Sequence, residues 1–200
     1  MNNQTNPLIA ITFDDGPNPI YTPKILDLVS HYNIHVSFSV LGDLAARHPG
    51  IVKCAVELGC EIINHSWNHE NFLKLTETEI SDNLIRTENA IYDSCHVHTA
   101  FVRPPYGNSD DRVEQITKAM GKSLIFWDVD SLDWKDKDAA VTVPKVISET
   151  GEGNIILLHD IYKTTYEAAI KIIPALLDKG YTPVTVSELT SHCSCSLTSS

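Results

Sequence analysis

Two adjacent carboxylates, Asp14 and Asp15, follow the apolar run at residues 8–11 and precede Gly16 and Pro17. Successive side chains of a strand point to opposite faces, but a turn directly after the strand can aim both acids into one cleft. Two carboxylates this close repel each other, which raises one pKa unless a cation lies between them. This arrangement suits a metal ligand beside a general base. A plain turn is the alternative, since Asp, Gly and Pro all favour turns.

Two histidines four positions apart, His65 and His69, form a second candidate group. On one turn of helix they would share a face, and two imidazoles with one carboxylate make a zinc site that leaves positions open for water and substrate. A chain with nine histidines produces this spacing easily by chance, so a pair of surface histidines is the alternative. The remaining histidines are interpreted as structural or surface residues: His31, His35, His48, His96, His98 and His192.

Residues capable of acid, base or metal chemistry follow five of the apolar runs that we interpret as strands. They are Asp14 and Asp15, His65 and His69, Arg103 and Tyr106, Asp130 and Asp133, and His159 and Asp160. In parallel sheets and barrels, ligands bind at the carboxyl ends of the strands. We therefore expect all five groups to meet at one rim of the fold.

The elements that must position these groups alternate between apolar runs and amphipathic stretches. Strands are expected at 8–13, 36–41, 60–64, 101–102, 124–129, 154–158 and 182–186, and helices at 23–32, 50–58, 110–120, 141–149 and 166–179. Thr76 and Glu79 form a capping box for one more helix, Thr22 is the expected N-cap of the first helix, and Pro174 is expected to kink the last. The repeated strand-then-helix order predicts a parallel sheet in an α/β protein, and the number of units favours a distorted (β/α)7-8 barrel in a single domain. An open doubly wound sheet is the alternative, because spacing alone does not show closure.

Length and composition fit one domain with short ends. We assign residues 1–7 to an N-terminal extension, 8–190 to the domain and 191–200 to a polar C-terminal tail. A hydrophobic content of 42% is enough for a full core. The net charge of -11 argues against nucleic acid and anionic membrane surfaces as partners. No apolar run has the length of a membrane span.

The cysteines and the N-terminus leave the compartment open. The five cysteines are Cys54, Cys60, Cys95, Cys193 and Cys195, so at least one thiol has no partner within a monomer. A disulfide could tether the segment with the last two to the body, and the pairing stays open. The first seven residues have neither the basic region nor the apolar core of a signal peptide. Both a cytosolic chain and one whose leader has been replaced by Met1 fit this observation.

Five short motifs occur in order along residues 12–160. They are Thr12-Phe13-Asp14-Asp15-Gly16-Pro17, His65-Ser66-Trp67-Asn68-His69, Arg103-Pro104-Pro105-Tyr106-Gly107, Asp130-Ser131-Leu132-Asp133-Trp134 and Leu157-Leu158-His159-Asp160. Together they resemble the polysaccharide deacetylases of carbohydrate esterase family 4, which include chitin and peptidoglycan deacetylases. Each motif alone is weak, but five in the right order are highly specific. The one soft departure is Asn68, where the family often carries Thr or Ser.

The resemblance implies how the acidic and imidazole groups divide their roles. Asp15, His65 and His69 would bind a divalent metal, with Zn²⁺ as the first choice and Co²⁺ or another divalent ion as alternatives. Asp14 would be the general base that takes a proton from the attacking water. Arg103 would pair with Asp14 and orient it.

The resemblance also implies an acid and a substrate pocket. His159 would protonate the leaving amine as general acid, held by Asp133, with Asp130 as the alternative partner. The backbone N–H of Tyr106 would stabilise the oxyanion. Trp134 and Leu157 would form the walls of the pocket for the acetyl methyl group.

By this resemblance, residues 8–190 would be the catalytic domain of a metal-dependent hydrolase that removes N-acetyl groups from polymers of N-acetylglucosamine and releases acetate. Its substrate would be chitin, a chitooligosaccharide or the glycan of peptidoglycan. The protein would be a monomer, secreted or associated with a cell wall. Two alternatives remain: an O-deacetylase of the same family that acts on acetylated xylan, and a catalytically silent homologue that binds polysaccharide.

Overall fold

The computed structural model describes residues 6–196 of the chain, and the side chains of residues 6–192. Most of the expected N-terminal extension and the last part of the expected C-terminal tail lie outside the described residues. No described helix combines the length and the apolar character that crossing a membrane requires.

The cysteine pairing that the sequence left open is tested only in part. Cys54, Cys60 and Cys95 carry free thiols. The side chains of Cys193 and Cys195 lie outside the described part of the chain, so a tether from the tail stays a prediction.

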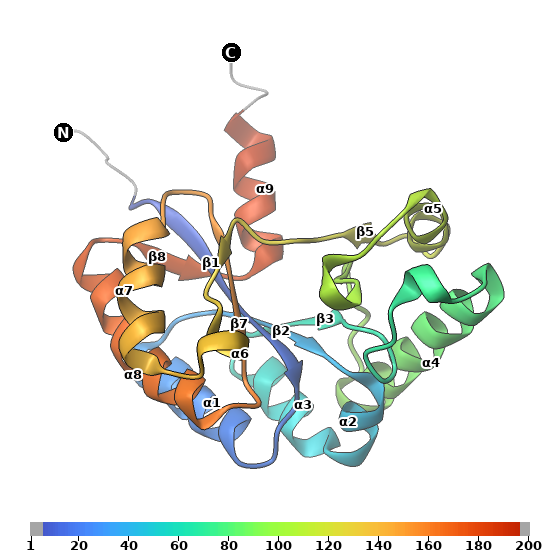
Figure 1. Cartoon of the computed structure of the whole chain (residues 1–200), viewed down its shortest axis with the longest axis horizontal. Coiled ribbons are helices and arrows are strands. Elements are labelled where there is room, and N and C mark those ends of the chain that lie inside the picture. The colour runs from blue at the N-terminus through green and yellow to red at the C-terminus, as the bar shows by residue number, and fades with distance from the viewer. Residues whose placement is uncertain (1–5, 197–200) are drawn as a thin grey trace.

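A parallel sheet of eight strands forms the centre of the domain and curls into an open barrel (Figure 1). The strands are β1 (Leu8–Gly16), β2 (Ser37–Val40), β3 (Glu61–Asn64), β4 (Phe101–Val102), β5 (Ser123–Leu124), β6 (Val129–Asp130), β7 (Ile155–His159) and β8 (Thr182–Val184). Their order is β5-β4-β3-β2-β1-β7-β6, and β8 pairs with the beginning of β1. The two ends of this order, β5 and β6, are not paired with each other within the described chain. The sheet therefore confirms the predicted α/β domain with a distorted barrel, rather than a doubly wound sheet.

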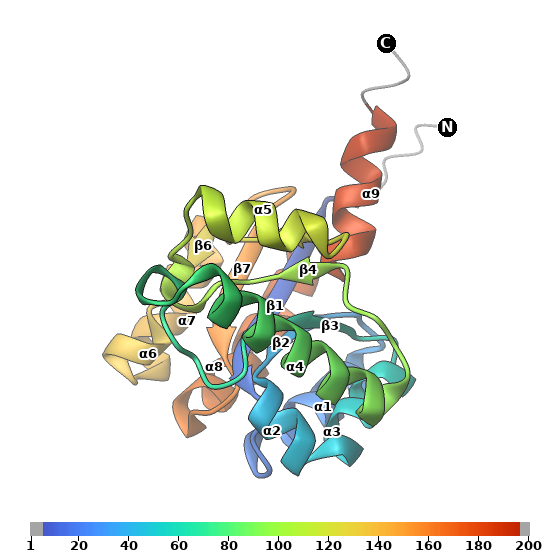
Figure 2. The ribbon, with the colours of Figure 1, turned by 90° about the vertical axis from the view of Figure 1, so that its right-hand side faces the viewer.

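Helices form a belt around the outside of the sheet (Figures 1 and 2). They are α1 (Tyr21–Tyr32), α2 (Gly42–Arg47), α3 (Pro49–Glu57), α4 (Glu77–Cys95), α5 (Asp111–Ala119), α6 (Asp133–Asp136), α7 (Ala139–Glu149), α8 (Lys163–Asp178) and α9 (Val186–Ser196). Contacts run from α7 to α8, then to α1, α3, α4 and α5. Single 3-10 turns at Phe72–Lys74 and Pro105–Gly107 lie in the loops after β3 and β4.

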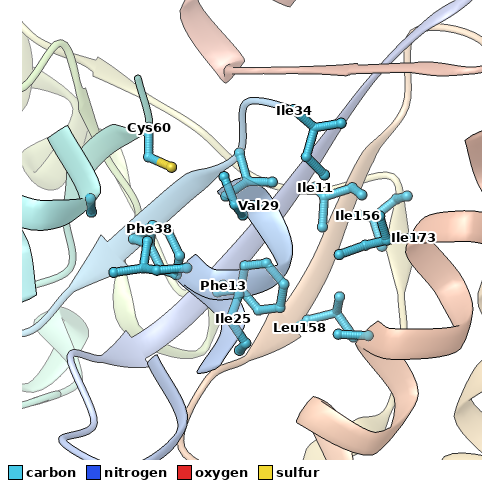
Figure 3. Packing of buried hydrophobic residues seen from close by; sticks show 14 of the residues in the cluster. Ile11, Phe13, Ile25, Val29, Ile34, Phe38, Cys60, Ile156, Leu158 and Ile173 are labelled. Carbon is cyan, nitrogen blue, oxygen red and sulfur yellow. The ribbon is translucent and has the colours of Figure 1, made fainter. Parts of the chain in front are cut away.

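Side chains along β1 point alternately to the apolar core between sheet and helices and to the interior of the barrel. Ile11 and Phe13 point outward and pack under the helices, where Phe13 stacks on Phe38 of β2 with ring centroids 5.5 Å apart (Figure 3). The residues between and after them, Thr12 and Asp14, point to the opposite face, as the period of two requires. One strand thus supplies both an apolar core and a polar group at the carboxyl end of the barrel.

Helix α9 begins where the sequence predicts the end of a strand. The strand β8 ends at Val184, because Thr185 and Glu188 form a capping box in which each backbone N–H bonds to the other side chain, at 3.1 and 2.7 Å. The first turns of α9 bury Val186 and Leu189 against the amino-terminal end of the barrel. The helix then projects from the body (Figure 2) and runs into the tail expected from residue 191.

Two capping predictions have different outcomes. The capping box of Thr76 and Glu79 is confirmed at the start of α4. The prediction that Thr22 caps α1 is wrong, because α1 begins at Tyr21 and the Asn18 side chain accepts the N–H groups of Ile20 and Tyr21 at 2.8 and 3.0 Å. Thr22 lies inside the first turn.

The strand expected at 124–129 is two short strands at opposite ends of the sheet. Between them, backbone groups find partners outside a ladder: the carbonyl of Phe126 accepts a hydrogen bond from Arg103 at 3.0 Å. The helix α2 had no counterpart in the sequence prediction, and α8 starts at Lys163, ahead of residue 166, and continues past Pro174.

Candidate active site

The carboxyl ends of the strands surround one pocket of about 440 Å³. All the candidate residues predicted from the sequence line this pocket except Arg103, Asp133 and Asp160, which are buried and contact lining residues. The lining residues are Asp14, Asp15, His65, His69, Pro104, Tyr106, Gly107, Trp127, Asp130, Trp134, Leu157, His159 and Tyr162. The predicted meeting of five strand ends at one rim is therefore confirmed.

Asp14 is held by a fully buried guanidinium. Arg103 Nη1 donates to Asp14 Oδ1 at 2.6 Å and to Thr12 Oγ1 at 2.7 Å. The other carboxylate oxygen, Asp14 Oδ2, lies 3.7 Å from His65 Nε2. Because Arg103 also donates to a backbone carbonyl of the 125–128 segment, its position is fixed from three sides. Asp14 is thus presented to the pocket with one oxygen engaged and the other directed towards the imidazoles.

Asp15, His65 and His69 bring one ligand atom each to a common point. Asp15 Oδ1 lies 3.3 Å from Nε2 of both histidines, and the three ligand atoms all lie within 4.8 Å of one another. Burial alone would raise the pKa of Asp15, but the two neighbouring imidazoles lower it. Burial would lower the pKa of His65, yet the charges of Asp14 and Asp15 raise it.

The donor set fits a divalent cation. Asp15 Oδ1 is buried and has no hydrogen-bond partner, although it faces two imidazole nitrogens. His65 Nδ1 contacts the backbone carbonyl of Arg103 at 2.7 Å, which orients the ring and leaves Nε2 free to bind a metal. An oxygen and two imidazole nitrogens match the ligands that Zn²⁺ takes in catalytic sites, where a further position stays open.

The two histidines do not lie on one helical turn, the arrangement in which their spacing would place them on a shared face. They lie on the loop after β3, and two left-handed residues, Ser66 with φ 74° and His69 with φ 63°, fold that loop back on itself. The ring centroids of His65 and His69 come to 5.0 Å from each other by this route. The spacing therefore identified the right pair of histidines, but a folded loop, rather than a helical turn, brings them together.

Left-handed backbone recurs around this pocket. Besides the two residues of the histidine loop, Asp15, Tyr106 and Leu132 have φ values of 73°, 61° and 55°. Residues with side chains rarely adopt this conformation, and where they do, the surrounding structure must hold them there. Such residues concentrate at functional sites, and here they come from the end of β1 and from the segments after β3, β4 and β6.

His159 and Asp133 form the second charged pair. Asp133 Oδ1 lies 2.7 Å from His159 Nδ1, while Oδ2 accepts the backbone N–H of His159 at 2.8 Å and the hydroxyl of Thr165 at 2.5 Å. Burial alone would lower the pKa of His159, but the hydrogen bond and the negative charge of Asp133 outweigh it, and the pKa rises to about 9. The alternative partner, Asp130, instead accepts the N–H of Leu132 at 2.9 Å.

The walls of the pocket are largely aromatic. Tyr106 and Trp134 remain 63% and 46% exposed, and Leu157 is a buried lining residue. Trp127 and Tyr162 complete the lining and were not predicted. Trp127 was hidden within an apolar run interpreted as strand, whereas the position of Tyr162, soon after His159, was a signal that could have been used.

Position 16, directly after the two acids, has room only for a glycine, because the carboxylate of Asp160 lies against it. A Cβ atom at Gly16 would come within 2.4 Å of Asp160 Oδ1, and Asp160 also accepts a hydrogen bond from the Thr22 hydroxyl. Burial, aided by the charges of Asp15 and Asp14, raises the pKa of Asp160 to about 7. The close approach of these two segments fixes the turn that carries the site.

Known proteins are similar to this chain in both sequence and fold. The sequence model of the polysaccharide deacetylase family matches residues 1–125. The peptidoglycan-N-acetylglucosamine deacetylase PgdA of Listeria monocytogenes is 36% identical over 186 residues, which are 93% of this chain and 39% of that protein. The peptidoglycan-N-acetylmuramic acid deacetylase PdaC of Bacillus subtilis is 40% identical over 182 residues, 91% of this chain and 38% of the relative. The chain thus spans about two fifths of the length of these relatives.

Solved structures agree. The structure of PdaC from Bacillus subtilis superposes with a TM-score of 0.89 at 39% identity, covering 93% of this chain and 91% of that one. A pseudoenzyme of carbohydrate esterase family 4 from Bacillus anthracis, BA3943, gives a TM-score of 0.86 at 27% identity and covers 92% of this chain and 65% of its own. The ordered motifs, the open barrel and these matches lead to one conclusion: the chain belongs to the polysaccharide deacetylase family, carbohydrate esterase family 4.

Proposed function

We propose that this domain is a zinc-dependent N-deacetylase that hydrolyses the acetamide of N-acetylglucosamine units in peptidoglycan or chitin and releases acetate. The observation that carries the proposal is that three groups face one pocket. These are the Asp14 carboxylate, which Arg103 holds, a ligand set of one carboxylate and two imidazoles, and the His159 imidazole, which Asp133 holds. Metal-assisted amide hydrolysis uses a base, a Lewis acid and an acid for the leaving amine, and these groups would supply the base, the site for the metal and the acid.

The Asp14–Arg103 pair and the His159–Asp133 pair would each carry out one proton transfer. A divalent ion held by Asp15, His65 and His69 would supply Lewis acidity, which polarises a carbonyl and acidifies water. Asp14, which Arg103 orients, would accept the proton of the attacking water. His159 carries its proton at neutral pH because of its raised pKa, so it can donate that proton to the departing amine.

The remaining wall residues orient the substrate. The backbone N–H of Tyr106 is the proposed donor to the oxyanion, and this residue has a left-handed backbone conformation with φ 61°. Trp134 offers a partly exposed ring on which a sugar can pack, and the buried Leu157 offers an apolar wall for the acetyl methyl group.

The names of the relatives support an N-acetylated glycan as substrate, since the two quoted above are peptidoglycan deacetylases. Peptidoglycan and chitin are polymers found outside the cytoplasm, so we propose that the protein is secreted or associated with a cell wall. We also propose that it acts as a monomer, because every group of the proposed site comes from one chain.

The test is acetate release from chitooligosaccharides, peptidoglycan and acetylated xylan, each with and without a chelator. The proposal predicts release from an N-acetylated glycan, loss of release with the chelator and recovery on adding Zn²⁺. Release from xylan alone would favour the O-deacetylase. A chain that binds zinc and glycan but releases no acetate would be a silent homologue, like the pseudoenzyme that shares its fold.

A further inference from the structure

The two histidines of the proposed metal site are held in different ways. His65 continues the hydrogen bonding of β3, with its N–H bonded to the Val40 carbonyl at 3.0 Å, and its ring is fixed by the carbonyl of Arg103. His69 follows four positions later, with its backbone N–H bonded to Ser66 Oγ at 3.0 Å and its ring against Tyr106. The placement of His69 therefore depends on the loop that joins the two histidines.

Neighbouring elements hold the first half of that loop by its backbone. All four backbone N–H and C=O groups of Ser66 and Trp67 have partners outside the loop. The bonds are Ser66 N to Asn64 Oδ1 at 3.1 Å, Gly42 N to Ser66 O at 2.9 Å, Asp43 N to Trp67 O at 3.0 Å and Trp67 N to Asn83 Oδ1 at 2.6 Å. Three of these partners lie in β3 or at the start of α2, next to the loop. Asn83 alone reaches it from the middle of α4, and its side chain is buried.

One face of α4 packs against Trp67. Asn83, Arg86 and Thr87 are spaced i, i+3 and i+4 and so lie on the same face of the helix. The guanidinium carbon of Arg86 lies 3.6 Å from the centroid of the Trp67 ring. Gly42 at the start of α2 also lies close to the ring, since a Cβ atom there would come within 2.6 Å of Trp67 Cε3 and 2.8 Å of Thr87 Oγ1. Trp67 therefore packs between α2 and α4, with Asn83 bonded to its N–H.

We propose that Asn83 is a positioning residue for the metal site: its bond to the N–H of Trp67 fixes the loop that presents His69 and thereby sets the affinity for the divalent ion. Without an acceptor, the partly buried Trp67 N–H would be left unpaired, and the loop would shift to give it a partner. Partners of this kind outside the ligand set usually change metal affinity by about 10- to 100-fold. This inference rests on the metal dependence in the proposed function.

The experiment compares Asn83→Ala, Asn83→Asp and Asn89→Ala. The first variant removes the acceptor, the second keeps a carboxyl oxygen in its place, and the third removes an exposed asparagine from the same helix as a matched control. Zinc affinity is measured by competition with a chromophoric chelator, and the visible spectrum of the Co²⁺ form reports the ligand geometry. We expect zinc binding about tenfold weaker and an altered cobalt spectrum for Asn83→Ala, with both close to wild type for Asn83→Asp and Asn89→Ala.

Circular dichroism and thermal unfolding of the chelated proteins show whether each variant folds. If Asn83→Ala does not fold, Arg86→Ala takes its place, because the Arg86 side chain is exposed and its loss removes only the ring contact with Trp67. We expect that variant to bind zinc about threefold more weakly. A folded Asn83→Ala, or in its absence a folded Arg86→Ala, with wild-type zinc affinity overturns this inference alone. A wild-type chain that binds no zinc overturns the proposed function as well.

Discussion

The guanidinium of Arg103 lies 2.6 Å from the carboxylate of Asp14, and both side chains are almost completely shielded from solvent. The pair joins the interior of the barrel to the pocket, because Arg103 also bonds to Thr12 within β1. A buried pair of this kind destabilises a protein strongly when one partner is removed, since the other charge is left uncompensated. The same contact therefore has one consequence for stability and another for catalysis.

The stability consequence is tested with Arg103→Met. We expect the free energy of unfolding to fall by about 3–5 kcal/mol, because Asp14 would keep a buried charge without its partner. The matched control is Arg112→Met, which breaks a solvent-exposed pair with Asp110 and should cost much less stability. Urea unfolding followed by circular dichroism measures both, and equal losses for the two variants would contradict the account.

The catalytic consequence is tested with Asp14→Asn. The amide has nearly the same shape but is no base, so kcat for acetate release should fall by about 10²- to 10⁴-fold. Zinc affinity should stay close to that of the wild type, because the proposed ligands are Asp15, His65 and His69. A variant that keeps most of its turnover, or one that loses zinc and activity together, would remove Asp14 from its proposed role.

The pair of His159 and Asp133 predicts a pH dependence. The acid form of His159 is lost as pH rises through its pKa of about 9, so activity should decline on the alkaline side near that value. Asp133→Asn removes the charge that raises this pKa, so the alkaline limb of the kcat profile should move to lower pH, towards the ordinary imidazole value of about 6.5.

Asp130→Asn is the control for this shift, because Asp130 bonds to the N–H of Leu132 rather than to the imidazole. Its pH profile should match that of the wild type. The same raised pKa makes the protonated imidazole stabilise the fold below about pH 6.5, and this contribution should be lost as the pH rises to about 9. An alkaline limb that moves in Asp130→Asn and not in Asp133→Asn would reverse the assignment.

The turn that carries the two acids should be intolerant of a methyl group. Gly16→Ala places a Cβ atom within 2.4 Å of the Asp160 carboxylate, which must move or push the turn away. We expect a loss of about 1–3 kcal/mol in stability, together with weaker zinc binding. Gly50→Ala, at the start of α3, has nothing within 4 Å of the new atom and should leave both quantities close to wild type. Matching melting temperatures for the two variants would contradict this reasoning.

The sequence alone predicted which residues meet, because parallel strands end at one edge and each polar group follows an apolar run. It also predicted that Asp14 and Asp15 face one cleft, because a turn after the strand relaxes the alternation of side chains. It did not predict how His65 and His69 come together. Their loop depends on left-handed residues and on partners from α2 and α4, and these long-range contacts leave no trace in a local pattern.

Local rules failed where a tertiary contact or an overlooked capping group decided the outcome. The apolar run at 124–129 has the pattern of one strand, yet hydrogen bonds to Arg103 and to the backbone of β7 divide it between the two ends of the sheet. Thr22 fits the N-cap pattern, but Asn18 caps the helix and Thr22 bonds to Asp160 instead. The start of α9 was readable, since Thr185 and Glu188 have the spacing of a capping box.

The central claim is that Asp15, His65 and His69 hold one divalent ion. Anomalous diffraction at the zinc absorption edge, from crystals of the zinc-loaded protein, tests it most directly. The account predicts a single strong peak about 2.0–2.2 Å from Asp15 Oδ1 and from Nε2 of both histidines. A peak bound by other residues, or no peak at these three in crystals that contain zinc, would contradict it.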